Sequence, residues 1–129
     1  MTRAERVRSR ADFERAYSTG VRIHGRYLTL FVTPNGGGLS RLGIAATRKL
    51  GGATDRNRAK RLARELFRRH KVTSGLDIII VPRREMLDAP FASLEADYLD
   101  ALARRDRARP AGPRRPRGRG RRPGTAPGV

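Results

Sequence analysis

The stretch from Asp55 to His70 has the pattern of an amphipathic helix, and it constrains the fold more than any other segment. At about 100° per residue, its apolar residues fall on one stripe. The stripe consists of Ala59, Leu62, Ala63, Leu66 and Phe67. The opposite side carries Asn57, Lys60, Arg61, Arg64 and Arg68. One face can therefore pack on a sheet while the other presents cations to the surroundings.

The charge of this helix favours a polyanionic partner. Between Arg56 and Lys71 there are eight basic residues and one acid, Glu65. A helix face that is merely solvated usually mixes both signs, because like charges one turn apart destabilise a helix. Guanidinium groups match phosphate oxygens bidentately and stay charged at any biological pH. The pattern indicates contact with nucleic acid over a plain solvated face.

The cationic character extends over the whole chain. Its 129 residues allow one domain, and the net charge is +18. Residues 1–103 contain 20 basic and 11 acidic residues, so this part alone carries +9, which an anionic ligand would relieve. A membrane partner is disfavoured, because the apolar stripe is rich in Ala and lacks the aromatic anchors of interfacial helices.

Other classes of protein are excluded by what the sequence lacks. It has no cysteine, so disulfides, thiolate metal sites and a cysteine nucleophile are excluded. It has no apolar run of 18 residues and no secretory signal at the N-terminus, so a cytoplasmic protein is expected. The carboxylates are scattered and the two histidines have no orienting partner nearby, so we predict neither catalytic residues nor a metal site in this chain.

The remaining pattern predicts a small α+β domain. Residues 1–8 are expected to be frayed, and residues 104–129, rich in Arg, Pro and Gly, to be disordered. The first half is expected to form a helix from a Ser9 cap to about Ser18, a strand over 21–33 that is interrupted at Gly25, and a strand over 41–49. The basic helix follows, with Thr54 or Asp55 as its cap. A strand over 76–81 and a helix from Pro90 to about Ala103 complete the domain.

Three aromatic residues lie where they could serve a ligand. Phe13 and Tyr17 are one turn apart on the first helix, and Phe31 shares a strand face with Tyr27 and the threonines. The face formed by Leu28, Leu30 and Val32 can supply the core. Phe13, Tyr17 and Phe31 are then either ordinary core residues or the border of a groove in which unpaired bases stack.

The sequence resembles a known family over residues 6–103. The segment from Arg41 to Gly51, followed by Ala53 and by the Arg56-Asn57-Arg58 helix, resembles the signature of the bacterial ribonuclease P protein component. The first helix (12–20) and the strand over 77–81 are similar to the corresponding parts of that family.

The resemblance implies a fold and a function. The fold is an α+β two-layer sandwich with a four-stranded sheet and αβββαβα order, similar to the second domain of ribosomal protein S5, over residues 1–103. The function is that of an RNA-binding subunit of ribonuclease P, which removes the 5′ leader from precursor tRNA. The implied partners are the ribonuclease P RNA, which mainly holds the Mg²⁺ ions, and the leader, with no membrane and no small-molecule cofactor.

The family also implies two sets of site residues. The RNA-binding set is Arg56, Asn57, Arg58, Lys60, Arg61, Arg64 and Arg68. The leader-cleft set is Phe13, Tyr17, Phe31, Arg48 and Lys49. Two other functions stay open: a noncatalytic RNA-binding module, such as a ribosomal protein, and a protein-only nuclease, against which the missing acid cluster argues.

Overall fold

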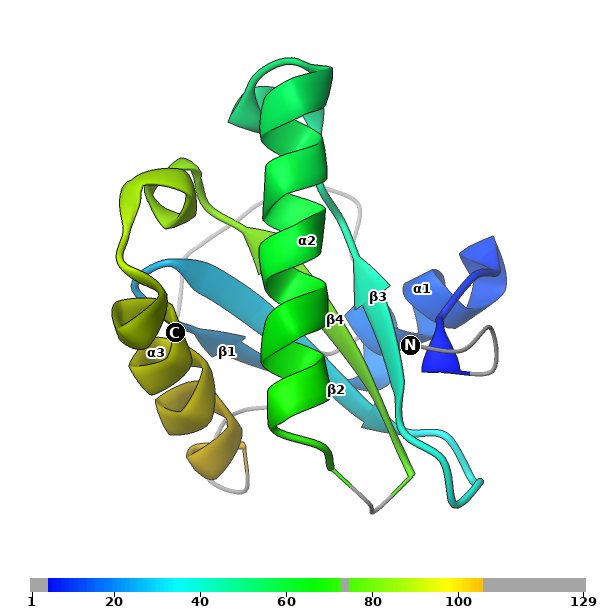
Figure 1. The fold of residues 1–129 in the computed structure, drawn as a ribbon. Coiled ribbons are helices and arrows are strands. Elements are labelled where there is room, and N and C mark those ends of the chain that lie inside the picture. Colours follow the sequence, from blue (N-terminus) through cyan, green and yellow to red (C-terminus); the bar gives the residue numbers. More distant parts are fainter. Residues whose placement is uncertain (1–4, 73–74, 106–129) are drawn as a thin grey trace, which may run out of the picture.

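Helices cover both faces of a four-stranded mixed sheet in the computed structural model, which describes residues 5–72 and 75–105 (Figure 1). The strand order is β1-β2-β4-β3, with β4 antiparallel to β2 and parallel to β3. The elements are α1 (Arg10–Thr19), β1 (Val21–His24), β2 (Leu28–Pro34), β3 (Arg41–Ile44), the 3₁₀ turn η2 (Arg48–Leu50), α2 (Ala53–Arg69), β4 (Leu76–Pro82), the 3₁₀ turn η3 (Arg84–Asp88) and α3 (Phe91–Ala103). The predicted α+β class with a four-stranded sheet is confirmed. The predicted two-layer arrangement is wrong, because helices pack on both faces of the sheet, and the likeness to ribosomal protein S5 stays a prediction.

The main core lies between the sheet and the pair α2 and α3, which lie in front of it in Figure 1. On β2, Leu28, Leu30 and Val32 are buried in this core, as their alternation predicts. Of the predicted apolar stripe of α2, Ala59, Ala63, Leu66 and Phe67 are buried and Leu62 is partly buried. The basic side of α2 therefore faces away from the sheet.

The opposite face of the sheet is covered by α1. Ser9 caps this helix as predicted, because its Oγ accepts a hydrogen bond of 3.0 Å from the backbone N–H of Asp12. Ala16 is fully buried against Ile79, and the partly buried Phe13 and Tyr17 pack beside them. Phe31 points to this face, as predicted, so all three aromatic candidates lie on the side of the sheet that carries α1.

The expectation that the N-terminus is frayed is wrong for residues 5–8. Arg6 pairs with Leu42 in a parallel bridge at the edge of β3, and the backbone N–H of Val7 donates to the Leu42 carbonyl over 2.9 Å. Val7 is buried under α1, and its burial fixes this segment.

The strand predicted over 41–49 is too long, because β3 ends at Ile44. The N–H of Ala45 still donates to the Ile80 carbonyl over 2.9 Å. The next residue of β4 that faces β3 is Pro82, which has no N–H, so the ladder cannot continue. Thr47 then caps the turn η2, and Leu50 is buried in a small cluster of its own with Ala59 and Leu87.

The predicted cap of α2 is also wrong. The helix begins at Ala53 with Gly52 as the N-cap, and no side chain caps it. Asp55 lies in the first turn, where its charge suits the positive end of the helix. Its carboxylate occupies the space that a side chain at Gly51 would need, and Gly51 has a φ of 133°.

The predicted domain boundary at Ala103 coincides with the end of α3. Residues 106–129, most of the predicted disordered tail, lie outside the described residues. Within the described ranges, no helix is long and apolar enough to cross a membrane.

Candidate nucleic-acid interface

The three aromatic candidates form one cluster between α1 and the sheet. The ring centroids of Phe13 and Tyr17 are 6.3 Å apart. Those of Tyr17 and Phe31 are 4.9 Å apart with the rings nearly perpendicular. All three side chains are partly buried, so each is at once a core residue and a surface residue.

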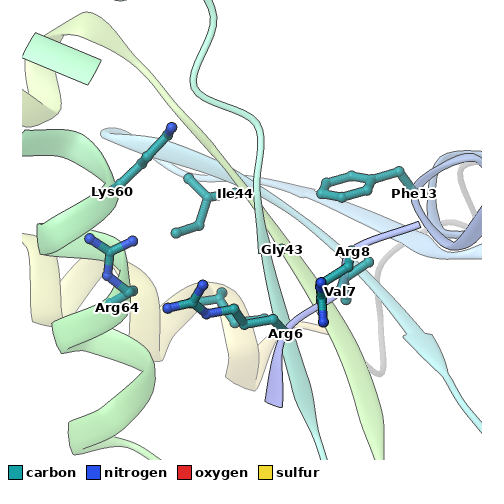
Figure 2. A pocket seen from close by; sticks show the side chains of 9 residues that line it. Arg6, Val7, Arg8, Phe13, Gly43, Ile44, Lys60 and Arg64 are labelled. Carbon is teal, nitrogen blue, oxygen red and sulfur yellow. The ribbon is translucent and has the colours of Figure 1, made fainter. Parts of the chain in front are cut away.

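A pocket of about 390 Å³ lies at β3, and its lining includes Phe13 of α1 and two basic residues of α2. Figure 2 shows Phe13 extending from α1 toward β3 while Lys60 and Arg64 extend from α2 on the other side of the strand. Its lining combines apolar residues with four cations. The residues that line it are Arg6, Val7, Arg8, Phe13, Leu42, Gly43, Ile44, Lys60 and Arg64.

The family resemblance predicts that these residues belong to two different sites. Phe13 was expected in the leader cleft, and Lys60 and Arg64 in the RNA-binding set. The structure brings the three together at one pocket. Tyr17 and Phe31 lie behind Phe13 and do not line this pocket, and Arg48 and Lys49 are exposed on η2, away from its lining.

The cations of α2 fall into two groups. Arg68 is held by Glu65 through two hydrogen bonds, of 2.6 and 3.2 Å, and Arg69 also pairs with Glu65. These contacts lower the pKa of Glu65 and raise that of Arg69. Within the described residues, the remaining cations of the predicted set have no acidic partner; they are Arg56, Arg58, Lys60, Arg61 and Arg64. Arg58, Arg61 and Asn57 are exposed, while Arg56 is half-buried.

Arg6 and Arg8 are functional candidates that the residue pattern does not predict. Both line the pocket because the N-terminal segment lies along β3. The available signal was Val7, a lone apolar residue in a charged segment, which is a weak indication of burial.

A second cationic region lies on the same side of the sheet as α1. His24 stands opposite Thr29 in the sheet, and its Nδ1 is 3.4 Å from the Thr29 hydroxyl and 3.5 Å from a guanidinium nitrogen of Arg83. His24 is largely exposed, but partial desolvation by its neighbours, together with the charges of Arg22 and Arg83, lowers its pKa below the ordinary value.

The chemistry that this site offers is binding by charge and by ring surfaces. Among the described residues, no group of three or more His, Asp or Glu side chains is placed to hold a metal ion. His70 contacts Glu95 over 3.0 Å at the junction of α2 and α3, and His24 lies among arginines. Cations beside a partly exposed aromatic ring, such as that of Phe13, are a combination that can bind single-stranded nucleic acid.

A model of the protein family described as Ribonuclease P matches residues 1–106. The chain belongs to the ribonuclease P protein family. The ribonuclease P protein component of Thermotoga sp. (strain RQ2) is 42% identical over 109 residues, which cover 80% of this chain and 93% of that protein.

Solved structures of ribonuclease P proteins have the same fold. The protein from Thermotoga maritima matches with a TM-score of 0.70 at 37% identity, over 78% of this chain and 96% of that one. The protein from Staphylococcus aureus matches with a TM-score of 0.70 at 32% identity, over 78% and 94% of the two chains.

Proposed function

We propose that this chain is the RNA-binding subunit of ribonuclease P, which supports endonucleolytic removal of the 5′ leader from precursor tRNA by a catalytic RNA. The observation that carries the proposal is the pocket that Phe13, Lys60 and Arg64 line together. It joins a ring surface for a base to cations for the backbone, on a chain that belongs to the ribonuclease P protein family.

The leader is the ligand that suits this pocket. A single-stranded leader exposes the faces of its bases, and stacking on an aromatic side chain contributes roughly 1–3 kcal/mol per base. Phe13 offers its ring to such a base, with Tyr17 and Phe31 supporting it from behind. Lys60 and Arg64 stand where they can neutralise the adjacent phosphates, and Arg6 and Arg8 do so from the other rim.

The catalytic RNA is assigned to the outer side of α2. Asn57, Arg58 and Arg61 are exposed there, and the two arginines have no acidic partner within the described residues. Arg56, in the first turn of the same helix, is half-buried with its Nε enclosed, so it borders this surface and does not lie on its exposed part. Arg68 belongs to this surface by position, but its guanidinium group is already held by Glu65. Arg48 and Lys49, exposed on η2, lie at the end of α2 that begins this surface.

The bond-breaking chemistry is assigned to the RNA subunit. We propose that it holds the Mg²⁺ ions, while this chain binds and orients the two RNAs. The family acts in RNA processing. We propose that this chain works in the cytoplasm.

Photocrosslinking tests the leader assignment. Precursor tRNA with 4-thiouridine at single leader positions is bound to the holoenzyme and irradiated, and the crosslinked peptides are identified. We expect crosslinks to peptides that contain Phe13 or Lys60 and Arg64, and none when the 4-thiouridine is placed in the mature 3′ half. Leader crosslinks that fall exclusively on α3 would contradict the assignment.

A further inference from the structure

The end of α1 that carries Phe13 is tied to the sheet by a network of charged side chains. Asp12 and Arg15 of α1 meet Arg41 of β3 and Asp77 of β4. All of these contacts lie on the sheet face that α1 covers, because Arg41 and Asp77 are paired in register there. This network is separate from the residues proposed to touch RNA.

Asp77 is the anchor of the network. Its side chain is fully buried, and each carboxylate oxygen accepts two hydrogen bonds. Oδ1 accepts from Arg41 Nε over 2.8 Å and from Asn35 Nδ2 over 3.0 Å. Oδ2 accepts from Arg41 Nη2 over 2.6 Å and from Arg15 Nη2 over 3.3 Å. Burial alone raises the pKa of Asp77, but these hydrogen bonds and charges outweigh it and hold the pKa below its ordinary value.

Arg41 connects the buried Asp77 to α1. The same Nη2 that binds Asp77 also donates to Asp12 Oδ2 over 3.3 Å. The hydrogen bond to Asp77 raises the pKa of Arg41, so its charge is constant. A guanidinium group is planar and its donors point in fixed directions, so the position of Asp12 follows from that of Asp77. With 27% of its side chain exposed, Arg41 has its Nε and Nη2 donors committed to carboxylates.

The ring of Phe13 fits against β3 with no spare space. Gly43 lies two residues after Arg41 on the same face, and a Cβ there would come within 2.9 Å of Phe13 Cζ and 2.6 Å of Ile79 Cδ1. The ring thus touches the strand backbone directly. A small displacement of α1 would move the ring out of this contact and change the shape of the pocket.

We propose that Arg41 is a positioning residue for leader recognition: by joining Asp77 to Asp12, it holds α1 so that Phe13 stays against Gly43 at the pocket. The inference rests on the proposed function for the identity of the ligand. The geometry of Phe13 itself can be measured without any RNA.

The first test examines the free protein. Phenylalanine is replaced by 4-fluorophenylalanine, and the chain has four such positions, Phe13, Phe31, Phe67 and Phe91. The ¹⁹F resonance of Phe13 is assigned from a Phe13→Leu variant. In Asp12→Asn and in Arg41→Lys we expect this resonance to shift or broaden, while that of the buried Phe67 stays and reports an intact fold. An unchanged Phe13 resonance in Asp12→Asn would overturn the inference.

Asp100→Asn is the matched control for charge. It makes the same change in net charge at an exposed position on α3, where Asp100 pairs with Arg104. We expect its Phe13 resonance to equal that of the unaltered chain. A shift as large as that of Asp12→Asn would mean that net charge, and not the link through Arg41, moves the ring.

The second test uses the holoenzyme. The ratio of the Kd for mature tRNA to the Kd for leader-bearing precursor measures leader selectivity. We expect Asp12→Asn to reduce it roughly three- to fivefold, the effect of one partly exposed ion pair, and Asp100→Asn to leave it unchanged. In a Phe13→Ala background, Asp12→Asn should add no further loss, because it acts through Phe13. Independent, additive losses would overturn the inference.

The two tests separate this inference from the proposed function. If the unaltered holoenzyme shows no leader selectivity, the proposed leader function fails, while the ¹⁹F comparison still decides whether Arg41 and Asp12 position Phe13. If selectivity is present and the Phe13 resonance does not respond to Asp12→Asn, the positioning role fails alone.

Discussion

At the scale of single residues, the basic side chains of this molecule differ in whether a carboxylate of the chain pairs with them. Arg41 and Arg68 are held by carboxylates within the chain, whereas Lys60 and Arg64 line the pocket and have no acidic partner among the described residues. The sequence alone treats these side chains as equivalent. Their separation depends on contacts such as that between Arg41 and Asp77, which are 36 positions apart.

Phe13 gives the most specific consequence at this scale. Phe13→Ala removes the ring that lines the pocket, so we expect leader-bearing precursor to bind roughly 5- to 150-fold more weakly, while mature tRNA binds as before. Phe91→Ala is the matched aromatic control, because Phe91 packs on the other side of the sheet. Equal losses for both RNAs, or the same loss in Phe91→Ala, would make Phe13 a residue of the core alone.

His24 makes the stability of the fold depend on pH. Its pKa is lowered, so below about 6.5 the unfolded chain binds more protons than the folded one. The contribution of neutral His24 to stability is therefore complete above that pH and is lost as the pH falls through the folded pKa. An NMR titration of the ring should give a midpoint below 6.5, and Arg83→Gln should raise it. A midpoint at or above 6.5 in the unaltered chain would be inconsistent with the observed surroundings.

At the scale of elements, α2 packs one side on the core, and we propose that its basic side binds RNA. Arg64→Ala should weaken the binding of this chain to the ribonuclease P RNA and to precursor tRNA. It should also reduce the magnitude of the slope of log K against log salt concentration by about one unit, the effect of one lost phosphate contact. Arg68→Ala, on the same helix with the same change in charge, should change the slope less, because Glu65 already pairs with Arg68. Equal slopes for Arg64→Ala and the unaltered chain would remove Arg64 from the interface.

The periodic elements were predictable from the sequence, and their junctions were less so. The three helices and the buried faces of β2 and β4 follow from residue spacing and from caps such as Ser9. The end of β3 was missed because it depends on Pro82, in a different strand whose pairing the sequence does not state. The start of α2 was missed because Gly52 caps it without a side chain.

At the scale of the whole molecule, the candidate site was predicted in its parts but not in its arrangement. Phe13, Lys60 and Arg64 were all named from the sequence, yet they come from two helices on opposite faces of the sheet. All three line one pocket because that pocket lies at β3, the last strand of the sheet, beside which both helices and the N-terminal segment lie. The contribution of Arg6 and Arg8 depends on the same edge, which residue patterns alone do not identify.

The central claim is that this chain supports cleavage by an RNA to which it binds, and reconstitution tests it most directly. Purified chain, a bacterial ribonuclease P RNA and precursor tRNA are combined at low Mg²⁺, and leader removal is measured with each component omitted in turn. We expect the chain to raise cleavage by the RNA roughly tenfold or more, about 1.4 kcal/mol of barrier, and to cleave nothing alone. A chain that neither binds the RNA nor raises cleavage, or one that cleaves without it, would contradict the claim.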